Sequence, residues 1–132
     1  MNILRSISAV AAGFLAIVAT HTGTDQVMHA AGVFPPAGQG MHDPALNAIA
    51  LAYRSVFTVF GCWLTARLAP SHPKDHALFL GLIGTALASA AAVATRDMNL
   101  GPAWYPLALA VSAFPLAWLG AALHRSEVSR PD

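Results

Sequence analysis

The sequence predicts an all-α integral membrane protein, a four-helix bundle of up-down-up-down topology, and three observations lead to this prediction. Of the 132 residues, 56% are hydrophobic and 10% are charged, whereas soluble domains carry roughly 25% charged residues. The apolar residues gather in four long stretches that short turn-like segments separate. No stretch shows the period-two alternation of a strand, and an open sheet cannot exist in lipid.

The four stretches set the expected spans of a single domain, residues 1–132. Each stretch is near or above the roughly 20 residues that a helix needs to cross about 30 Å of hydrocarbon. Proline, glycine and polar residues mark the breaks, and connections this short make successive helices antiparallel. The spans are expected at about residues 7–33, 45–66, 77–95 and 103–123.

The placement of lysine and arginine predicts the orientation of the bundle. Five of the seven basic residues precede the first span, flank the turn between the second and third spans, or follow the fourth span. The first loop has no basic residue, and the third loop has one, Arg96, beside Asp97. The positive-inside rule therefore predicts that both termini are cytoplasmic. The five residues on the predicted cytoplasmic side are Arg5, Arg67, Lys74, Arg125 and Arg130.

The N-terminal segment allows a second interpretation. Arg5, the roughly thirteen apolar residues after it and the small residues near Ala19 are also typical of a cleaved signal peptide. The apolar character resumes beyond this point, through Val27, Ala30 and Val33. This continuation favours a long helix that is retained in the protein.

Two charged residues are expected to pair inside the membrane. Arg54 lies about ten residues into the second span, where a lone arginine costs about 2.5–3.5 kcal/mol on insertion scales. Asp25 lies nine residues before the turn begins at Phe34, and Arg54 lies ten residues after it ends at Pro44. At 1.5 Å per residue, the two side chains reach nearly the same depth on antiparallel helices. The expected salt bridge either fixes the helix register or lines a polar path.

His21, Asp25 and His29 follow at intervals of four residues and therefore share one face of the first helix, with Thr24 beside them. Such spacing can relay protons or bind a divalent metal. Three ligands on one straight helix span about 12 Å, however, which is too far to converge on one ion. A cation would also be repelled by Arg54. No metal site or other cofactor is predicted, and hydrogen bonding within the bundle is the simpler interpretation.

One face of the second helix is polar or small and is expected to turn toward the first helix. These residues can hydrogen-bond across the helices or simply let the backbones approach closely. The face consists of Asn47, Arg54, Thr58, Gly61 and Thr65. The predicted polar cluster of the two helices consists of His21, Thr24, Asp25, His29, Arg54 and Thr58.

The third helix carries Gly84, Ala88 and Ala92 at intervals of four residues, the small-residue pattern of a tight helix contact. This stripe is expected either to pack inside the bundle or to form a homo-oligomer. The single cysteine, Cys62, excludes an internal disulfide and a zinc site of CxxC type. No catalytic set of residues is recognisable, and a net charge of +1 does not indicate a nucleic-acid partner.

Several short segments, spread over nearly the whole chain, resemble those of a group of small four-span bacterial membrane proteins with no established activity. The segments include Gly23-Thr24-Asp25, Ala52-Tyr53-Arg54 and Gly101-Pro102-Ala103-Trp104-Tyr105-Pro106. The resemblance implies a bacterial inner-membrane protein. It implies no catalytic residue.

Three functions are compatible with the sequence. The first is a non-enzymatic structural or accessory component that acts through helix contacts in the lipid bilayer and predicts a filled bundle core. The second is an oligomeric, proton-coupled transporter or channel for a small solute, which would use Asp25, Arg54, His21 and His29. The third is a metal- or redox-active membrane enzyme that uses the histidines.

Overall fold

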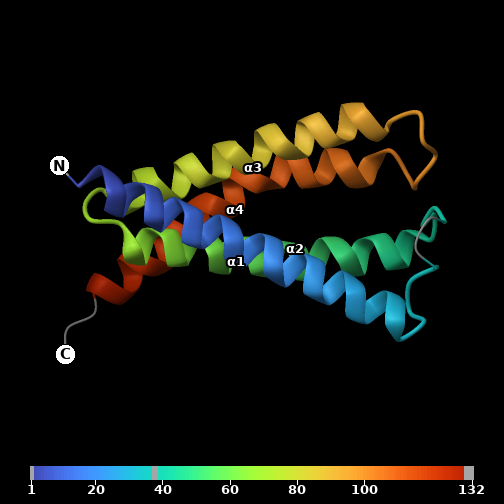
Figure 1. Ribbon diagram of the computed structural model, residues 1–132, viewed down its shortest axis with the longest axis horizontal. Helices are drawn as coiled ribbons and strands as arrows, with labels where there is room; N and C mark the ends of the chain where they lie inside the picture. Colours follow the sequence, from blue (N-terminus) through green and yellow to red (C-terminus); the bar gives the residue numbers. More distant parts are fainter. Residues whose placement is uncertain (1, 37–38, 130–132) are drawn as a thin grey trace.

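A computed structural model describes residues 2–36 and 39–129, and these residues form four helices with no strand. All four are long and apolar enough to cross a membrane. In Figure 1 successive helices run in opposite directions along the long axis, and α1 begins at the end of the molecule where α4 finishes. The helices are α1 (Ile3–Ala30), α2 (Pro44–Leu68), α3 (Pro73–Thr95) and α4 (Trp104–Ser129).

The helices are arranged as two hairpins. α1 packs closely on α2, and α3 packs closely on α4. The hairpins meet mainly where α2 contacts α4, and more weakly where it contacts α3. Among the described residues, α1 has few contacts with α3 and none of comparable closeness with α4. The first hairpin is therefore held to the second mostly through α2.

The helix boundaries differ from the expected spans where local backbone chemistry decides them. α1 ends at Ala30 because Gly32 adopts a left-handed backbone (φ 76°). The N–H groups of Val33 and Phe34 then turn back to the carbonyl of Met28, at 3.0 and 3.2 Å, as glycine-terminated helices do. The expected span runs to Val33 because the apolar side chains continue to that residue. Apolar character does not show where helical hydrogen bonding stops.

α2 and α3 each begin at a proline, Pro44 and Pro73. Proline suits this position because its missing N–H would have no helical partner there. Asp43 caps α2 by accepting a hydrogen bond from the N–H of Ala45 at 2.8 Å. Both helices therefore start earlier than the spans expected at 45 and 77, and α4 continues to Ser129 beyond the expected end at 123.

The end of the bundle that holds the termini is tightly filled by small residues. A buried core there joins α2, α3 and α4, and Val10, Phe14 and Ile17 of α1 pack against it. Such small side chains let helices approach closely. The core consists of Cys62, Ala66, Ala77, Leu80, Ala117 and Ala121.

α1 and α2 cross at two glycines. A Cβ atom added to Gly13 would lie 2.6 Å from the carbonyl oxygen of Gly61, and one added to Gly61 would lie 2.9 Å from that of Gly13. One turn away, the buried hydroxyl of Thr65 donates a hydrogen bond to the carbonyl of Ala9 at 2.9 Å. The backbones are therefore close enough for a side chain on one helix to bond directly to the backbone of the other.

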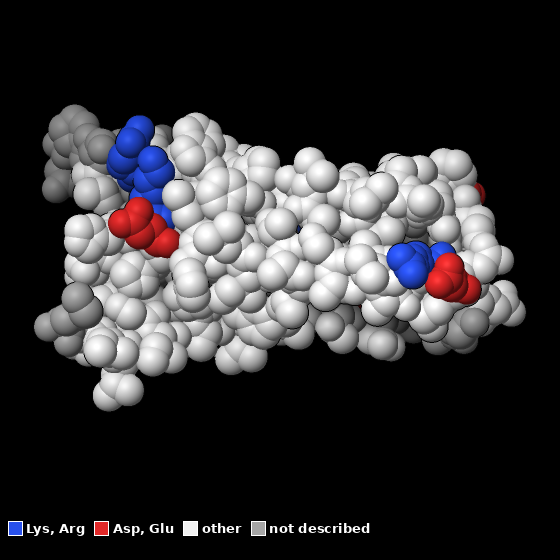
Figure 2. Space-filling view, turned by 90° about the horizontal axis from the view of Figure 1, so that it is seen from above, with Lys and Arg blue, Asp and Glu red and all other residues white. Residues whose placement is uncertain are grey.

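Charged side chains gather at the two ends of the molecule. Figure 2 shows blue and red groups at each end of this face and a long, almost uncharged stretch between them. Many large apolar side chains are exposed along the helices, including Leu15, Val56, Leu87 and Val111. An apolar belt between charged ends is the pattern expected of helices that contact lipid.

Candidate functional site

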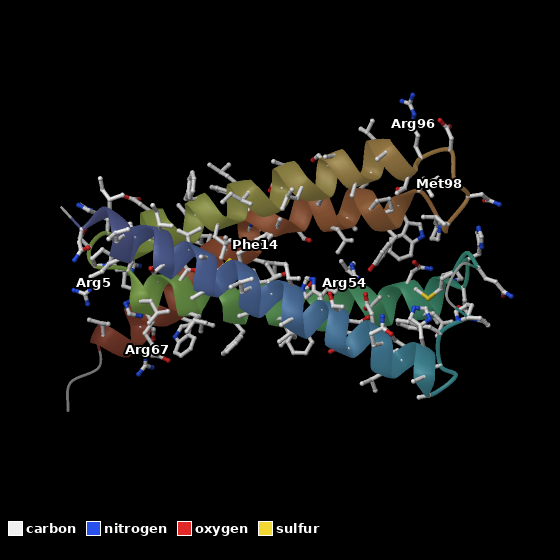
Figure 3. All side chains as sticks on the ribbon, in the orientation of Figure 1. Arg5, Phe14, Arg54, Arg67, Arg96 and Met98 are labelled. Atoms are coloured by element: carbon white, nitrogen blue, oxygen red, sulfur yellow. The ribbon has the colours of Figure 1, made fainter. Side chains whose placement is uncertain are left out.

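Asp25 and Arg54 form a salt bridge between α1 and α2. The Nη2 atom of Arg54 donates to Oδ2 of Asp25. Each side chain keeps 25% of its surface exposed, so the pair is mostly enclosed by protein. Figure 3 shows Arg54 well inside the length of the bundle, with Arg5 and Arg67 at one end and Arg96 at the other. The hairpin thus brings the two charges level, as their distances from the first turn predict.

Tyr53 completes the environment of the carboxylate. Its hydroxyl donates a hydrogen bond to Oδ1 of Asp25, so the two carboxylate oxygens have different donors. The guanidinium carbon of Arg54 lies 6.0 Å from the ring centroid of Tyr105 on α4, within range of a cation–π contact. Through this contact, a residue of the second hairpin also takes part in the environment of the ion pair.

His21 links the same region of the two helices. Its Nε2 atom lies 3.1 Å from the carbonyl oxygen of Arg54 and 3.4 Å from the hydroxyl of Thr58. Thr58 itself donates to the carbonyl of Arg54 at 2.8 Å. Since a carbonyl can only accept, the geometry with Arg54 requires a proton on Nε2 of His21. His21, Asp25, Arg54 and Thr58 are therefore brought together.

Two members of the predicted cluster form no hydrogen bond with its other members. Nδ1 of His29 is 2.7 Å from the carbonyl oxygen of Pro35, so His29 holds the turn that follows α1. Its ring also meets that of Phe34 edge to face. Thr24 makes no side-chain hydrogen bond within residues 2–36 and 39–129. The spacing of four residues placed His29 on the correct face but could not show that the chain folds back onto it.

The face of α2 toward α1 begins later than expected. Thr58, Gly61 and Thr65 all contact α1. Asn47 is only 2% exposed, but its amide donates to the carbonyls of Met41 and Asp43, at 3.0 and 2.9 Å. Asn47 therefore stabilises the loop before α2 and does not join the polar cluster.

A cavity of about 310 Å³ lies between all four helices beside the salt bridge. His21, Arg54, Ser55 and Thr58 form a polar patch on its wall, and the remaining lining is almost wholly apolar. The Nε atom of Arg54 is buried and has no hydrogen-bond partner among the described residues. The polar patch is therefore the part of the wall where a ligand or water can form hydrogen bonds.

A second cavity of about 470 Å³ adjoins the first, since both are lined by Ala88, Ala91 and Leu109. It extends to the loop end of the bundle, where Arg96 and Asn99 line it and are exposed. We call the two cavities together the crevice. At its inner end the crevice meets Cys62 and Leu80, which belong to the buried core. The crevice is therefore open at the loop end and closed at the other.

The small-residue stripe of α3 borders this crevice. Gly84 and Ala88 line the inner cavity, and a Cβ atom on Gly84 would lie 3.5 Å from the Cβ of Ala113 on α4. Ala92 lines the outer cavity. In the isolated chain the stripe therefore faces α4 and the crevice, and self-association through it stays a prediction.

Sequence reasoning missed both tyrosines of the site. Neither tyrosine belongs to a polar stripe at helical spacing, and an aromatic residue at a helix end, as Tyr105 is, is ordinarily interpreted as an interface anchor. The signal that could have found Tyr53 is its position next to Arg54, at the depth of Asp25. Tyr105 could not have been found, because its contact with Arg54 depends on how the two hairpins dock.

The described part of the chain contains no group of three or more His, Cys, Asp and Glu side chains that could hold a metal ion. His21 and His29 bond to backbone carbonyls, and Nε2 of His76 lies 2.9 Å from the hydroxyl of Ser6.

Four long apolar helices around an enclosed ion pair are characteristic of a multi-pass membrane protein. Comparison with known proteins adds nothing to this class, since no family model, no curated protein and no solved structure matches the chain.

Proposed function

We propose that this chain is a non-enzymatic component of the bacterial inner membrane that binds a small amphipathic molecule in the crevice. The observation that carries the proposal is a mostly apolar cavity with a polar patch of His21, Arg54, Ser55 and Thr58 on its wall. The cavities, at about 310 and 470 Å³, fall in the range of about 300–1,000 Å³ that ligand pockets occupy.

The chemistry of the crevice favours an uncharged ligand with a hydrogen-bond acceptor, such as a carbonyl compound. Asp25 already neutralises Arg54, so an anionic ligand would bring an unbalanced charge into an apolar site. An uncharged acceptor can contact the polar patch on the wall while its apolar body lies against α3 and α4. The core residues at the inner end of the crevice give no support to a through-going pore.

Photolabelling tests this proposal, with benzophenone as an uncharged probe that carries a carbonyl group. In liposomes, irradiation is expected to attach benzophenone mainly to crevice residues, as located by peptide mass spectrometry. Ala88→Phe, which fills the junction of the two cavities, should reduce this labelling at least fivefold. Ala90→Phe is the matched control, because Ala90 is exposed on the same helix and lines neither cavity.

Equal labelling of both variants, or labelling spread evenly over the lipid-facing side chains, would contradict the binding proposal. Proton flux in proteoliposomes that disappears in Asp25→Asn would instead support the oligomeric transporter.

We also propose that both termini are cytoplasmic, which the charge asymmetry supports. In a Cys62→Ala background, a membrane-impermeant maleimide added to intact spheroplasts should label Gln39→Cys, in the loop between α1 and α2. It should not label Ser71→Cys, in the turn between α2 and α3, until the membrane is broken. Both positions are exposed in the structure, so protection of Ser71→Cys reports the membrane and not burial. The reverse pattern would overturn the orientation.

A further inference from the structure

A further concave surface lies on the outside of the bundle, between α1 and α3. It is a groove of about 570 Å³, and its walls are almost entirely apolar. α1 and α3 belong to different hairpins and make few contacts with each other, so their side chains leave this space unfilled. Ile7, Phe79 and Leu87 line the groove and are 59%, 55% and 52% exposed. In a membrane the groove therefore opens toward the lipid.

The groove and the crevice share two side chains. Phe14 of α1 and Leu87 of α3 line both the groove and the inner cavity of the crevice. In Figure 3 Phe14 extends from near the middle of α1 toward the second hairpin. One residue from each helix thus forms the boundary between the two spaces, and an elongated molecule can pass between them from the crevice into the groove.

The polar side chains at the terminal end of the groove already bond to each other. Nδ1 of His76 lies 3.0 Å from the carbonyl oxygen of His72, so this nitrogen carries the proton. In neutral His76, Nε2 then accepts a hydrogen bond from the hydroxyl of Ser6, at 2.9 Å. Asp75, which is exposed, also lines this end and repels an anionic head. The polar head of a ligand is therefore favoured at the other end, beside the polar patch of the crevice.

We propose that the groove holds the hydrocarbon chain of the crevice ligand, whose uncharged carbonyl head lies at the polar patch. This inference rests on the proposed function and narrows its ligand to a membrane lipid with a carbonyl head and a long apolar chain. From Leu87 to Phe79 the groove follows about 12 Å of α3, at 1.5 Å per residue. This length is close to the roughly 15 Å of hydrocarbon in one leaflet.

Fluorescence quenching in phosphatidylcholine liposomes tests the proposal, with methyl dibromostearate as the probe. This ester has an uncharged carbonyl head, and the bromine atoms on its chain quench tryptophan. Phe79→Trp places a reporter in the groove, in a chain whose three natural tryptophans are replaced by phenylalanine. Leu82→Trp in the same background is the matched control, because Leu82 is equally exposed, at 55%, and lines neither the groove nor the crevice.

The ester should quench the Phe79→Trp reporter about fivefold more strongly than the Leu82→Trp reporter, which corresponds to about 1 kcal/mol of binding free energy. Brominated phosphatidylcholine should quench the two reporters alike, because its charged head cannot follow a chain into an apolar site.

Two further pairs of variants separate the groove from the crevice. Ala88→Phe fills the seat of the head and Ala11→Phe narrows the groove, so each should abolish the preference for the Phe79→Trp reporter. Ala90→Phe and Ala19→Phe should leave it unchanged, since both alanines are exposed on the same two helices and line neither space. Benzophenone has no chain, so its attachment to the crevice should survive Ala11→Phe.

Equal quenching of the two reporters by the ester would overturn the chain site, while benzophenone labelling of the crevice would still support the proposed function. A preference that survives Ala88→Phe, or that brominated phosphatidylcholine shares, would also overturn it, because the groove would then bind chains without the crevice. Loss of both the preference and the benzophenone labelling would overturn the proposed function as well.

Discussion

Asp25→Leu is expected to lower the free energy of unfolding by about 3 kcal/mol, because Arg54 would stay inside the bundle with no anion at its level. Breaking a buried pair costs about 3–5 kcal/mol, and partial exposure of both side chains places this pair at the low end. Tyr53 would also lose its acceptor, so its hydroxyl adds to the loss. Unfolding of purified protein in mixed micelles measures the change.

The opposite result, restored stability, is expected when the partners of the ion pair are replaced together. Asp25→Leu, Tyr53→Phe and Arg54→Met together remove every partner at once and should restore stability to within about 1 kcal/mol of the original chain, since apolar replacements of buried pairs are often neutral. The exposed pair of Arg96 and Asp97, 3.5 Å apart, is the control, and Asp97→Leu should change stability by less than about 0.5 kcal/mol. If Asp25→Leu unfolded no more readily than Asp97→Leu, the salt bridge would not stabilise the hairpin.

Gly13→Leu is expected to destabilise the protein by about 3 kcal/mol or to prevent folding. Even the first carbon of a side chain there would meet the hydroxyl of Thr65 and the backbone of Gly61. Backbone cannot move aside as the end of a flexible side chain can, so the helices must separate and the bond from Thr65 to Ala9 must break. The same micelle unfolding assay gives the magnitude.

Gly23 provides the comparison on the same helix. A Cβ atom at Gly23 would meet nothing within 4 Å, so Gly23→Ala should be neutral or stabilise α1 by up to about 1 kcal/mol through helix propensity. Equal losses in Gly13→Ala and Gly23→Ala would mean that glycine acts at both positions through flexibility and that the close crossing is not important.

The sequence predicted the four helices because their apolar stretches are long and the breaks between them carry proline and glycine. It also predicted the level placement of Asp25 and Arg54, since depth on a hairpin follows from counting residues. Counting cannot give the rotation of one hairpin against the other. For that reason the contact of Tyr105 with Arg54 and the crevice along α3 could not be derived.

The loop residues show a second limit. His29 and Asn47 looked like members of a helical polar face, but each bonds to a carbonyl of the chain between α1 and α2. Helical periodicity says which residues share a face, whereas it says nothing about where an irregular segment returns. Polar residues within two turns of a helix end are therefore the ones for which periodicity is least informative.

The division into two hairpins has a consequence for biogenesis. Among the described residues, the hydrogen-bond partners of the Asp25 carboxylate all lie on α2, and α1 has no close contact with α4. A nascent chain that has reached the end of α2 can thus neutralise its own guanidinium before α3 and α4 are synthesised. The ion pair therefore needs no residue of the second hairpin to form, whereas the crevice needs both hairpins.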